Sequence, residues 1–428
     1  MKKTKGLWLC VLFGILLLGA VPKAWCAEIA DYPNVVPSVS VTHAIVGVGA
    51  DEGSVCITWL SASDAPELLL LTPAAAGERS THASSLCLVS PMECVYKGLW
   101  RFTAQVTGLT PGTEYQYCIG PMGQLGHWSY VRRFQLRSCE PLEFLVLGDP
   151  QLRGGEERLV DQESFAQTLR AAGRAAPDAA FALYLGDLKQ TKLLGSREER
   201  KEARKEYSSL KQVLSATGLP AAIVCGNHDV EEEESVFVSE FSAPVGRWQN
   251  QPVLDYAFQA GQTLFLVINT NHTSTWEHIS FLTGALEEHP DARWRVLVMH
   301  HTLHPMSSEK DAKTLSSLRK RLTQVCCEME IDVVFSAHNH FYARTNPLDE
   351  AGECAEKGPV YVSLNTSSGS IYLDPWKKAL PEQRNTIKEC IQENRPNYTR
   401  CRVDEHVFQI ETFDAHTGEC VDAVELSK

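Results

Sequence analysis

The sequence has 428 residues, of which 53 are acidic and 40 are basic, so its formal net charge is −13 at pH 7. So acidic a surface repels polyanions, which argues against nucleic acid as a partner but leaves small phosphate esters as substrates. A chain of this length exceeds what one hydrophobic core usually serves, and we therefore predict two domains.

The N-terminus has the pattern of a secretory signal peptide. Basic residues in MKKTK precede an apolar run from Leu7 to about Ala20, which is shorter than the roughly 18 apolar residues that a membrane span needs. We expect residues 1–26 to be removed, leaving a secreted or periplasmic chain with no membrane span. A lipid-modified Cys26 is the less favoured alternative, because the bulky Trp25 precedes it where lipoproteins have small residues.

Twelve of the 14 cysteines lie beyond this leader, which is compatible with disulfides in an oxidising compartment. Cys87 with Cys94, and Cys390 with Cys401, are near enough in sequence to pair. Cys225 ends a strongly apolar run and is predicted to be a buried thiol instead.

The pattern of residues 27–139 predicts a small β-sandwich domain. Short alternating stretches such as Val55, Ile57 and Trp59 are separated by turns rich in glycine and proline, as in GLTPGTEYQY.

Residues 140–428 have the alternating strands and helices of an α/β domain. The predicted strands are buried on both faces and have the sequences LEFLVLG, AAFALYLG, AAIVCG, RWRVLVM and IDVVFSA. Helical spacing is found in Glu156–Ala172, Arg197–Leu214 and Ala312–Cys327. In the tail we expect a helix over 381–394 and two strands, HVFQIETF and CVDAVELS.

Each of these five strands is followed by side chains that can bind a metal ion. They are Asp149 and Gln151, Asp187, Asn227 with His228 and Asp229, His300 and His301, and His338 and His340. One such aspartate is more often a turn residue or a helix cap. Five coincidences at the same end of successive strands predict a metal centre, because ligand sites of α/β sheets gather at the carboxyl ends of the strands.

The order GD, GD, GNHD, H and HxH resembles that of the calcineurin-like metallophosphoesterases, from Leu142 to the C-terminus. The first domain resembles the fibronectin-like N-terminal domain of purple acid phosphatases through GLTPGTEYQYCIG, Trp128, Ser129 and Phe134. The resemblance implies an α/β fold with a four-layer α/β/β/α metallophosphoesterase domain, preceded by the small all-β sandwich domain.

The resemblance also implies roles for the metal-binding side chains. Asp187 would bridge two metal ions, Asp149 and His340 would bind the first, and Asn227, His300 and His338 would bind the second. The cofactors would be two divalent or mixed-valence ions of manganese, iron, zinc or magnesium.

Other side chains are expected to bind the substrate or to take part in catalysis. His228 would contact the phosphate or protonate the leaving group, Asp229 would orient it, and both are candidate catalytic residues. Asn227, His228 and His304 are candidate substrate-binding residues, and Lys189 is a further possible phosphate contact. His301 is expected to lie behind the site or to contact the substrate rather than to bind a metal ion.

The chain departs from the family at two positions. Gln151 stands where many calcineurin-like enzymes have histidine, and it is either a weak amide ligand or a hydrogen-bonding residue behind the metal. Gln190 stands where purple acid phosphatases have tyrosine, so the colour of a ferric tyrosinate is not expected.

The function expected from these features is an exported, metal-dependent phosphoesterase. It would hydrolyse phosphate monoesters or diesters by attack of a metal-bound hydroxide at a dinuclear centre. The alternative is a catalytically impaired binding protein whose β-domain recognises carbohydrate or protein. A nuclease would use the same centre but fits the acidic charge poorly.

Overall fold

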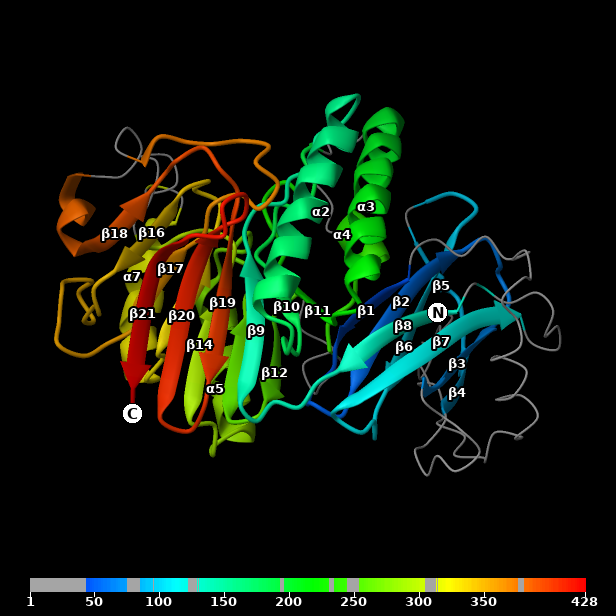
Figure 1. The fold of residues 1–428 in the computed structure, drawn as a ribbon, viewed down its shortest axis with the longest axis horizontal. Helices are drawn as coiled ribbons and strands as arrows, with labels where there is room; N and C mark the ends of the chain where they lie inside the picture. The colour runs from blue at the N-terminus through cyan, green and yellow to red at the C-terminus, as the bar shows by residue number, and fades with distance from the viewer. Residues whose placement is uncertain are drawn as a thin grey trace, which may run out of the picture.

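The computed structural model describes residues 44–74, 85–94, 96–121, 129, 131–192, 196–230, 235–244, 254–304, 313, 315–375 and 381–428. The predicted signal peptide and Trp128 lie outside these residues. Figure 1 shows the N-terminal β-domain at one end of the molecule and a larger layered domain at the other.

The N-terminal domain is a sandwich of two β-layers, as predicted. Its first layer contains β1 (Ile45–Val48), β2 (Val55–Ser61), β5 (Met92–Glu93) and β6 (Trp100–Val106). Its second layer contains β3 (Glu67–Pro73), β4 (Ser85–Val89), β7 (Thr113–Pro121) and β8 (Arg132–Leu136). Aromatic side chains fill the space between the layers: Trp59 stacks on Phe102 with ring centroids 5.3 Å apart, and Tyr115 stacks on Phe134 at 5.7 Å.

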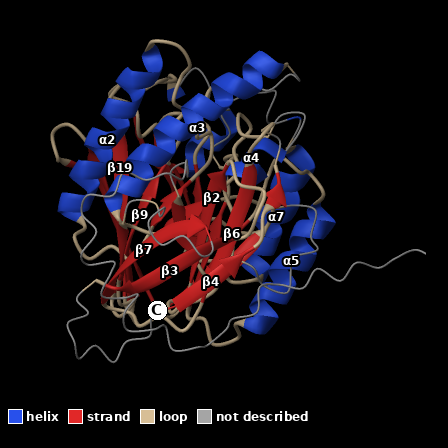
Figure 2. Ribbon diagram, turned by 90° about the vertical axis from the view of Figure 1, so that its right-hand side faces the viewer, coloured by secondary structure: helices blue, strands red, loops and turns tan. Residues whose placement is uncertain are grey.

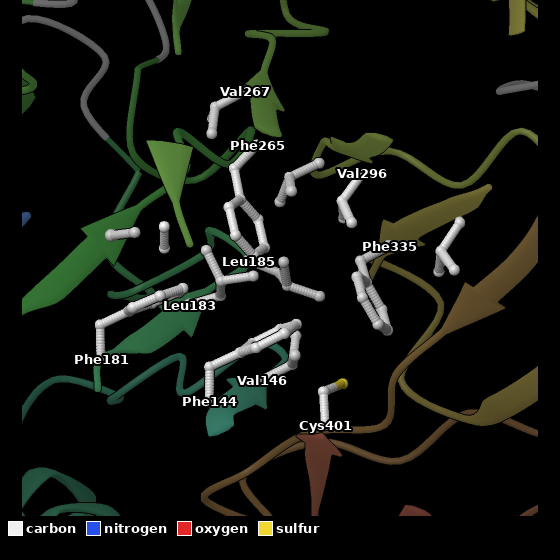
Figure 3. Close-up of a cluster of buried hydrophobic side chains, with 14 of the residues drawn as sticks. Phe144, Val146, Phe181, Leu183, Leu185, Phe265, Val267, Val296, Phe335 and Cys401 are labelled. Carbon is white, nitrogen blue, oxygen red and sulfur yellow. The ribbon is translucent and has the colours of Figure 1, made fainter. Parts of the chain in front are cut away.

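The larger domain is built on two facing sheets. The first holds β9 (Leu142–Leu147), β10 (Ala182–Tyr184), β11 (Ala221–Ile223), β19 (Asn397–Val403), β20 (Val407–Asp414) and β21 (Cys420–Ser427). The second holds β12 (Tyr256–Ala260), β13 (Thr263–Val267), β14 (Trp294–Val298), β15 (Val333–Ser336), β16 (Tyr342–Thr345), β17 (Val360–Ser363) and β18 (Ile387–Ile391). Phe144 and Phe181 from the first sheet meet Phe265 and Phe335 from the second in the core between them (Figure 3).

Helices cover the outer faces of both sheets (Figure 2). Leu145 and Leu147 point away from the central core and pack with residues of α2 (Glu157–Ala175) and α3 (Arg197–Thr217). On the other side, α5 (Thr275–Glu288) and α7 (Ser316–Glu328) cover the second sheet. The predicted α/β/β/α layering is therefore confirmed.

One sheet runs through both domains. β1 of the sandwich pairs in parallel with β11, with Gly47 opposite Ala221, so the first layer of the sandwich continues the first sheet of the larger domain. The predicted domain boundary at Cys139 lies between β8 and β9. The continuity of the sheet across the domains was not expected from the sequence.

One expectation is wrong. The helix expected over 381–394 is a short 3-10 helix, Pro381–Thr386, followed by β18, which pairs with β16. The twelve described cysteines are all free, including the two pairs that are near each other in sequence. Cys401 lies in the core between the two sheets, whereas Cys390 belongs to the edge strand β18. Cys225 is buried, as predicted.

Candidate metal centre

The predicted ligands follow β9, β10, β11, β14 and β15 at the carboxyl ends of these strands. The first three strands run parallel in one sheet, and the last two run parallel in the other. Glycine precedes several predicted ligands. At these positions the loops that follow the strands lie so close together that a side chain would not fit between them. A Cβ atom on Gly226 would lie 2.0 Å from the Asp187 nitrogen, and one on Gly186 would lie 2.9 Å from Nδ1 of His300. The glycines of the GD and GN pairs are thus needed because they let neighbouring loops approach each other closely.

Asp187, His300 and His338 form one group of potential ligand atoms. Nε2 of His300 lies 3.3 Å from Oδ1 of Asp187, 3.0 Å from Oδ1 of Asn227 and 3.3 Å from Nδ1 of His338. Nδ1 of His300 donates to the Leu185 carbonyl at 2.8 Å, which leaves Nε2 directed at the group. A backbone acceptor of this kind is typical of histidines that bind metal ions.

Asp149, Asp187 and His340 form a second group, and Asp187 is the residue that the two groups share. Nε2 of His340 lies 4.0 Å from Oδ1 of Asp149, while its Nδ1 donates to the Ile371 carbonyl at 3.1 Å. Asp149 is held by the backbone nitrogen of His338, which donates to its Oδ2 at 2.9 Å. A carboxylate common to both groups has the position that a bridging ligand needs.

The two groups fit a pair of cations. Oδ1 of Asp149 and Oε1 of Gln151 are buried and have no hydrogen-bond partner among the residues that the structure describes. Buried polar atoms without a partner are rare in folded proteins, and a bound ion would satisfy both. The donors are carboxylate, amide and imidazole groups, which together suit divalent ions of the first transition row.

Backbone strain is concentrated at the same place. Positive φ angles occur at Asp149 (35°), Gln151 (37°), Asp187 (50°), His338 (68°) and His340 (53°). A left-handed conformation costs a non-glycine residue roughly 1–2 kcal/mol. Strain of this kind persists where the surrounding structure imposes it, most often at functional sites.

The buried charged groups of the centre shift one another's pKa. Burial opposes the charged form of His300, but the Asp187 carboxylate outweighs this and raises the pKa of His300 to about 9. Burial would likewise raise the pKa of Asp187, but the His300 imidazolium holds this pKa well below its usual range. Burial raises the pKa of Asp149 and lowers that of His340 to about 4. A metal cation held by these residues would balance the charge of the Asp187 carboxylate in place of the His300 imidazolium.

His228 lies beside the centre and is partly exposed, as are Asn227 and His338. Its backbone nitrogen donates to Oδ1 of Asp187 at 2.7 Å, and its Nδ1 lies 3.0 Å from the Gln190 carbonyl oxygen. The other predicted ligands are buried, so these three residues form the solvent-facing part of the centre.

The Asp229 carboxylate, predicted to orient His228, binds other partners among the described residues. It accepts from the backbone nitrogens of Leu188 (3.1 Å) and Gly226 (2.9 Å) and from the Tyr207 hydroxyl (3.0 Å). Burial raises the pKa of Asp229 to about 6. Asp229 therefore holds the loops together, and a backbone carbonyl fixes the His228 ring.

The other two predicted substrate contacts, His304 and Lys189, lie away from the solvent. His304 is buried against α7, where its Nε2 lies 2.9 Å from Oγ1 of Thr323 and its ring packs on Tyr361. Lys189 is also fully buried. Nδ1 of His301 lies 2.9 Å from Oγ1 of Thr270, and its ring packs against that of His338.

Two residues that were not predicted from the sequence, Thr366 and Tyr207, support the ligands. The Thr366 hydroxyl donates to the Asp149 carbonyl at 2.8 Å, and Gly148 bridges to Thr366 across the two sheets. Tyr207 supports the centre indirectly, because its hydroxyl donates a hydrogen bond to Asp229. The polar stretch after the buried run VYVSL was the available signal for Thr366, whereas nothing local distinguished Tyr207 from a core residue.

Two facing sheets with a carboxylate shared between two ligand groups at their carboxyl edge form a candidate dinuclear metal centre. The family comparisons agree: residues 142–342 match the calcineurin-like phosphoesterase family, and residues 41–136 match the purple acid phosphatase N-terminal domain. The chain thus carries a calcineurin-like phosphoesterase domain behind a purple acid phosphatase N-terminal domain.

Two curated relatives come from Arabidopsis thaliana. Purple acid phosphatase 23 is 24% identical over 34% of this chain and 33% of its own length. Purple acid phosphatase 21 is 26% identical over 60% of this chain and 55% of its own length. The matched part of this chain therefore spans between a third and about half of these relatives.

Solved structures share the fold. A purple acid phosphatase from yellow lupin (Lupinus luteus) seeds has a TM-score of 0.70 at 14% identity, covering 92% of this chain and 75% of the other. PhoD has a TM-score of 0.59 at 12% identity, covering 92% and 90%. None of the described helices is long and apolar enough to cross a membrane.

Proposed function

We propose that this protein is an exported phosphoesterase that hydrolyses phosphate monoesters or diesters at a dinuclear metal centre. The observation that supports this proposal most directly is the sharing of Asp187 between two groups of ligand atoms. The N-terminal leader pattern in the sequence supports export. The complete ligand set argues against the alternative of a catalytically impaired binding protein.

Each residue of the centre has a proposed task. Asp149, Gln151 and His340 hold one ion, Asn227, His300 and His338 hold the other, and Asp187 lies between them. When bound, the two ions supply Lewis-acid stabilisation of the phosphate and lower the pKa of the attacking water. His228, exposed beside Asn227, contacts the phosphate and delivers a proton to the leaving oxygen.

We further propose that both ions are divalent. Asp149 and Asp187 are the two carboxylates of the proposed donor set, and the remaining donors are neutral imidazole or amide groups. Gln190 carries an amide where a tyrosinate would add a third negative charge. The amide of Gln151 suits hard ions, so manganese or magnesium fits the first position better than ferric iron.

The first test is the metal content of the purified mature protein, measured by elemental analysis. It is combined with hydrolysis of an aryl phosphate monoester and a diester, with and without added Mn²⁺. We expect close to two ions per chain and turnover of at least one ester. The ratio of the two rates would then separate a monoesterase from a diesterase.

Asp187→Asn is the matched variant, because asparagine tolerates the positive φ of this position better than alanine does. We expect it to lose bound metal and turnover while its circular dichroism stays that of the wild type. Asp291→Ala, at an exposed site in the loop after α5, serves as the control and should keep both. Undiminished turnover in Asp187→Asn would defeat the proposal.

A further inference from the structure

We propose that Lys189 is a positioning residue of the metal centre, an inference that rests on the function proposed above. The Lys189 side chain is fully buried. Its ammonium donates to the Thr191 carbonyl at 2.6 Å and to the His228 carbonyl. Lys189 thereby ties the loop that carries Asp187 to the loop that carries Asn227 and His228.

This tie acts on His228 in particular. The backbone nitrogen of His228 donates to Oδ1 of Asp187, and its carbonyl accepts from Lys189, so both polar groups of its backbone are held by the β10 loop. The ring is held by the Gln190 carbonyl in the same loop. Because Asn227 precedes His228 directly, loss of the Lys189 bond would disturb both a proposed ligand and the proposed acid.

Packing alone does not account for a lysine here. Removing an ammonium from water costs several kcal/mol unless other groups balance its charge. The buried carboxylates of Asp229 and Glu206 interact favourably with the charge of Lys189, and the Tyr207 ring centroid lies 5.8 Å from its Nζ. An apolar side chain would fill the same space without this cost, so the donor function is what the site requires.

Helix α3 supplies the support for this arrangement. The Tyr207 hydroxyl donates to Asp229, whose carboxylate also accepts from the backbone nitrogen of Leu188. Glu206, one residue earlier, accepts from the backbone nitrogen and the hydroxyl of Thr191 at 2.9 and 2.5 Å. The helix thus holds the partners of Lys189 in both loops.

The test is Lys189→Met in the full chain, since methionine is unbranched and lacks the donor. Mn²⁺ binding to the metal-free protein is measured by calorimetry. We expect one of the two binding events to weaken by roughly 10- to 100-fold, the range found when groups that orient metal ligands are removed. At saturating Mn²⁺, kcat should fall by more than KM rises, because a misplaced His228 acts mainly on the transition state.

Lys211→Met is the control, because Lys211 is also a buried lysine but pairs with Glu240 of α4 (Ser235–Glu240) at 2.5 Å. It should lower thermal stability and keep Mn²⁺ affinity and kcat. If Lys189→Met behaves like this control in both measurements, the inference is overturned.

If Lys189→Met does not fold, Tyr207→Phe takes its place, because it removes one donor to Asp229 without a change in charge. We expect the same Mn²⁺ binding event to weaken severalfold, and unchanged affinity together with unchanged kcat would overturn the inference. A wild-type protein that binds no Mn²⁺ at all would instead contradict the proposed function.

Discussion

The centre uses neutral donors for much of its ligand set. Asn227 and Gln151 offer amide oxygens, and Asp149 and Asp187 offer the carboxylates. With two divalent ions, this set retains a net positive charge. A phosphate ester would be attracted to that charge even though the protein as a whole is acidic.

Replacement of Gln151 by histidine tests whether its buried oxygen faces a metal ion. An imidazole nitrogen binds manganese or zinc more strongly than a neutral amide does. We expect Gln151→His to raise Mn²⁺ affinity by roughly tenfold, measured by calorimetry on the metal-free protein. Gln116→His in the β-domain controls for the added histidine. An unchanged affinity would make Gln151 a hydrogen-bonding residue behind the metal.

Helix α5 is connected to the loops of the metal centre through a buried pair, His278 and Asp255. Nδ1 of His278 lies 2.6 Å from Oδ2 of Asp255, and Nε2 lies 2.9 Å from the His272 carbonyl oxygen. Asp255 also accepts from the backbone nitrogen of Asn269. Asn271, in the same turn, donates to the Cys225 carbonyl beside the Asn227 loop.

This pair makes stability depend on pH. Both ring nitrogens of His278 face acceptors, so the Asp255 carboxylate outweighs burial and raises the pKa of His278 above 6.5. Burial raises the pKa of Asp255 as well, so the folded state binds protons more tightly at both groups. The stabilisation from His278 is fully present below about pH 6.5 and is lost as the pH rises through the folded pKa of His278.

We therefore expect the thermal midpoint to fall between pH 6 and pH 8.5, and to fall less in His278→Gln. Scanning calorimetry across this range measures the effect, with His406→Gln, at an exposed turn, as the control. Parallel pH profiles for the wild type and His278→Gln would show that the pair does not carry the dependence.

The two domains share one β-sheet and one cluster of buried hydrophobic side chains. β1 lies between β2 and β11, and Ile45 and Leu60 of the sandwich pack in the same cluster as Leu145 and Tyr207. Arg101 of β6 also donates to the Phe241 carbonyl beyond α4. Relative motion is the default for two domains of one chain unless their interface is large and hydrophobic, and here the shared sheet and the shared core connect the two domains.

We expect one cooperative unfolding transition for the whole chain. Calorimetry of the metal-free protein tests this, and two resolved transitions would contradict it. Residues 140–428 alone should unfold lower by on the order of 10 °C or aggregate, because the edge of β11 and the cluster around Ile45 would be exposed. Each kcal/mol lost shifts the midpoint by about 2–4 °C in a domain of 150–250 residues.

Local sequence patterns predicted most of the strands, the main helices and the candidate ligands at the carboxyl ends of the strands. These features depend on local periodicity and on the identity of the residue that follows a buried run, which the chain carries at each position. Tertiary structure decided where Lys189, Asp229 and His304 point, because neighbouring loop residues can face either the metal centre or the packing behind it. It also decided that β18 is a strand and that β1 joins β11, since both pairings unite segments far apart in the chain whose contact no local pattern records.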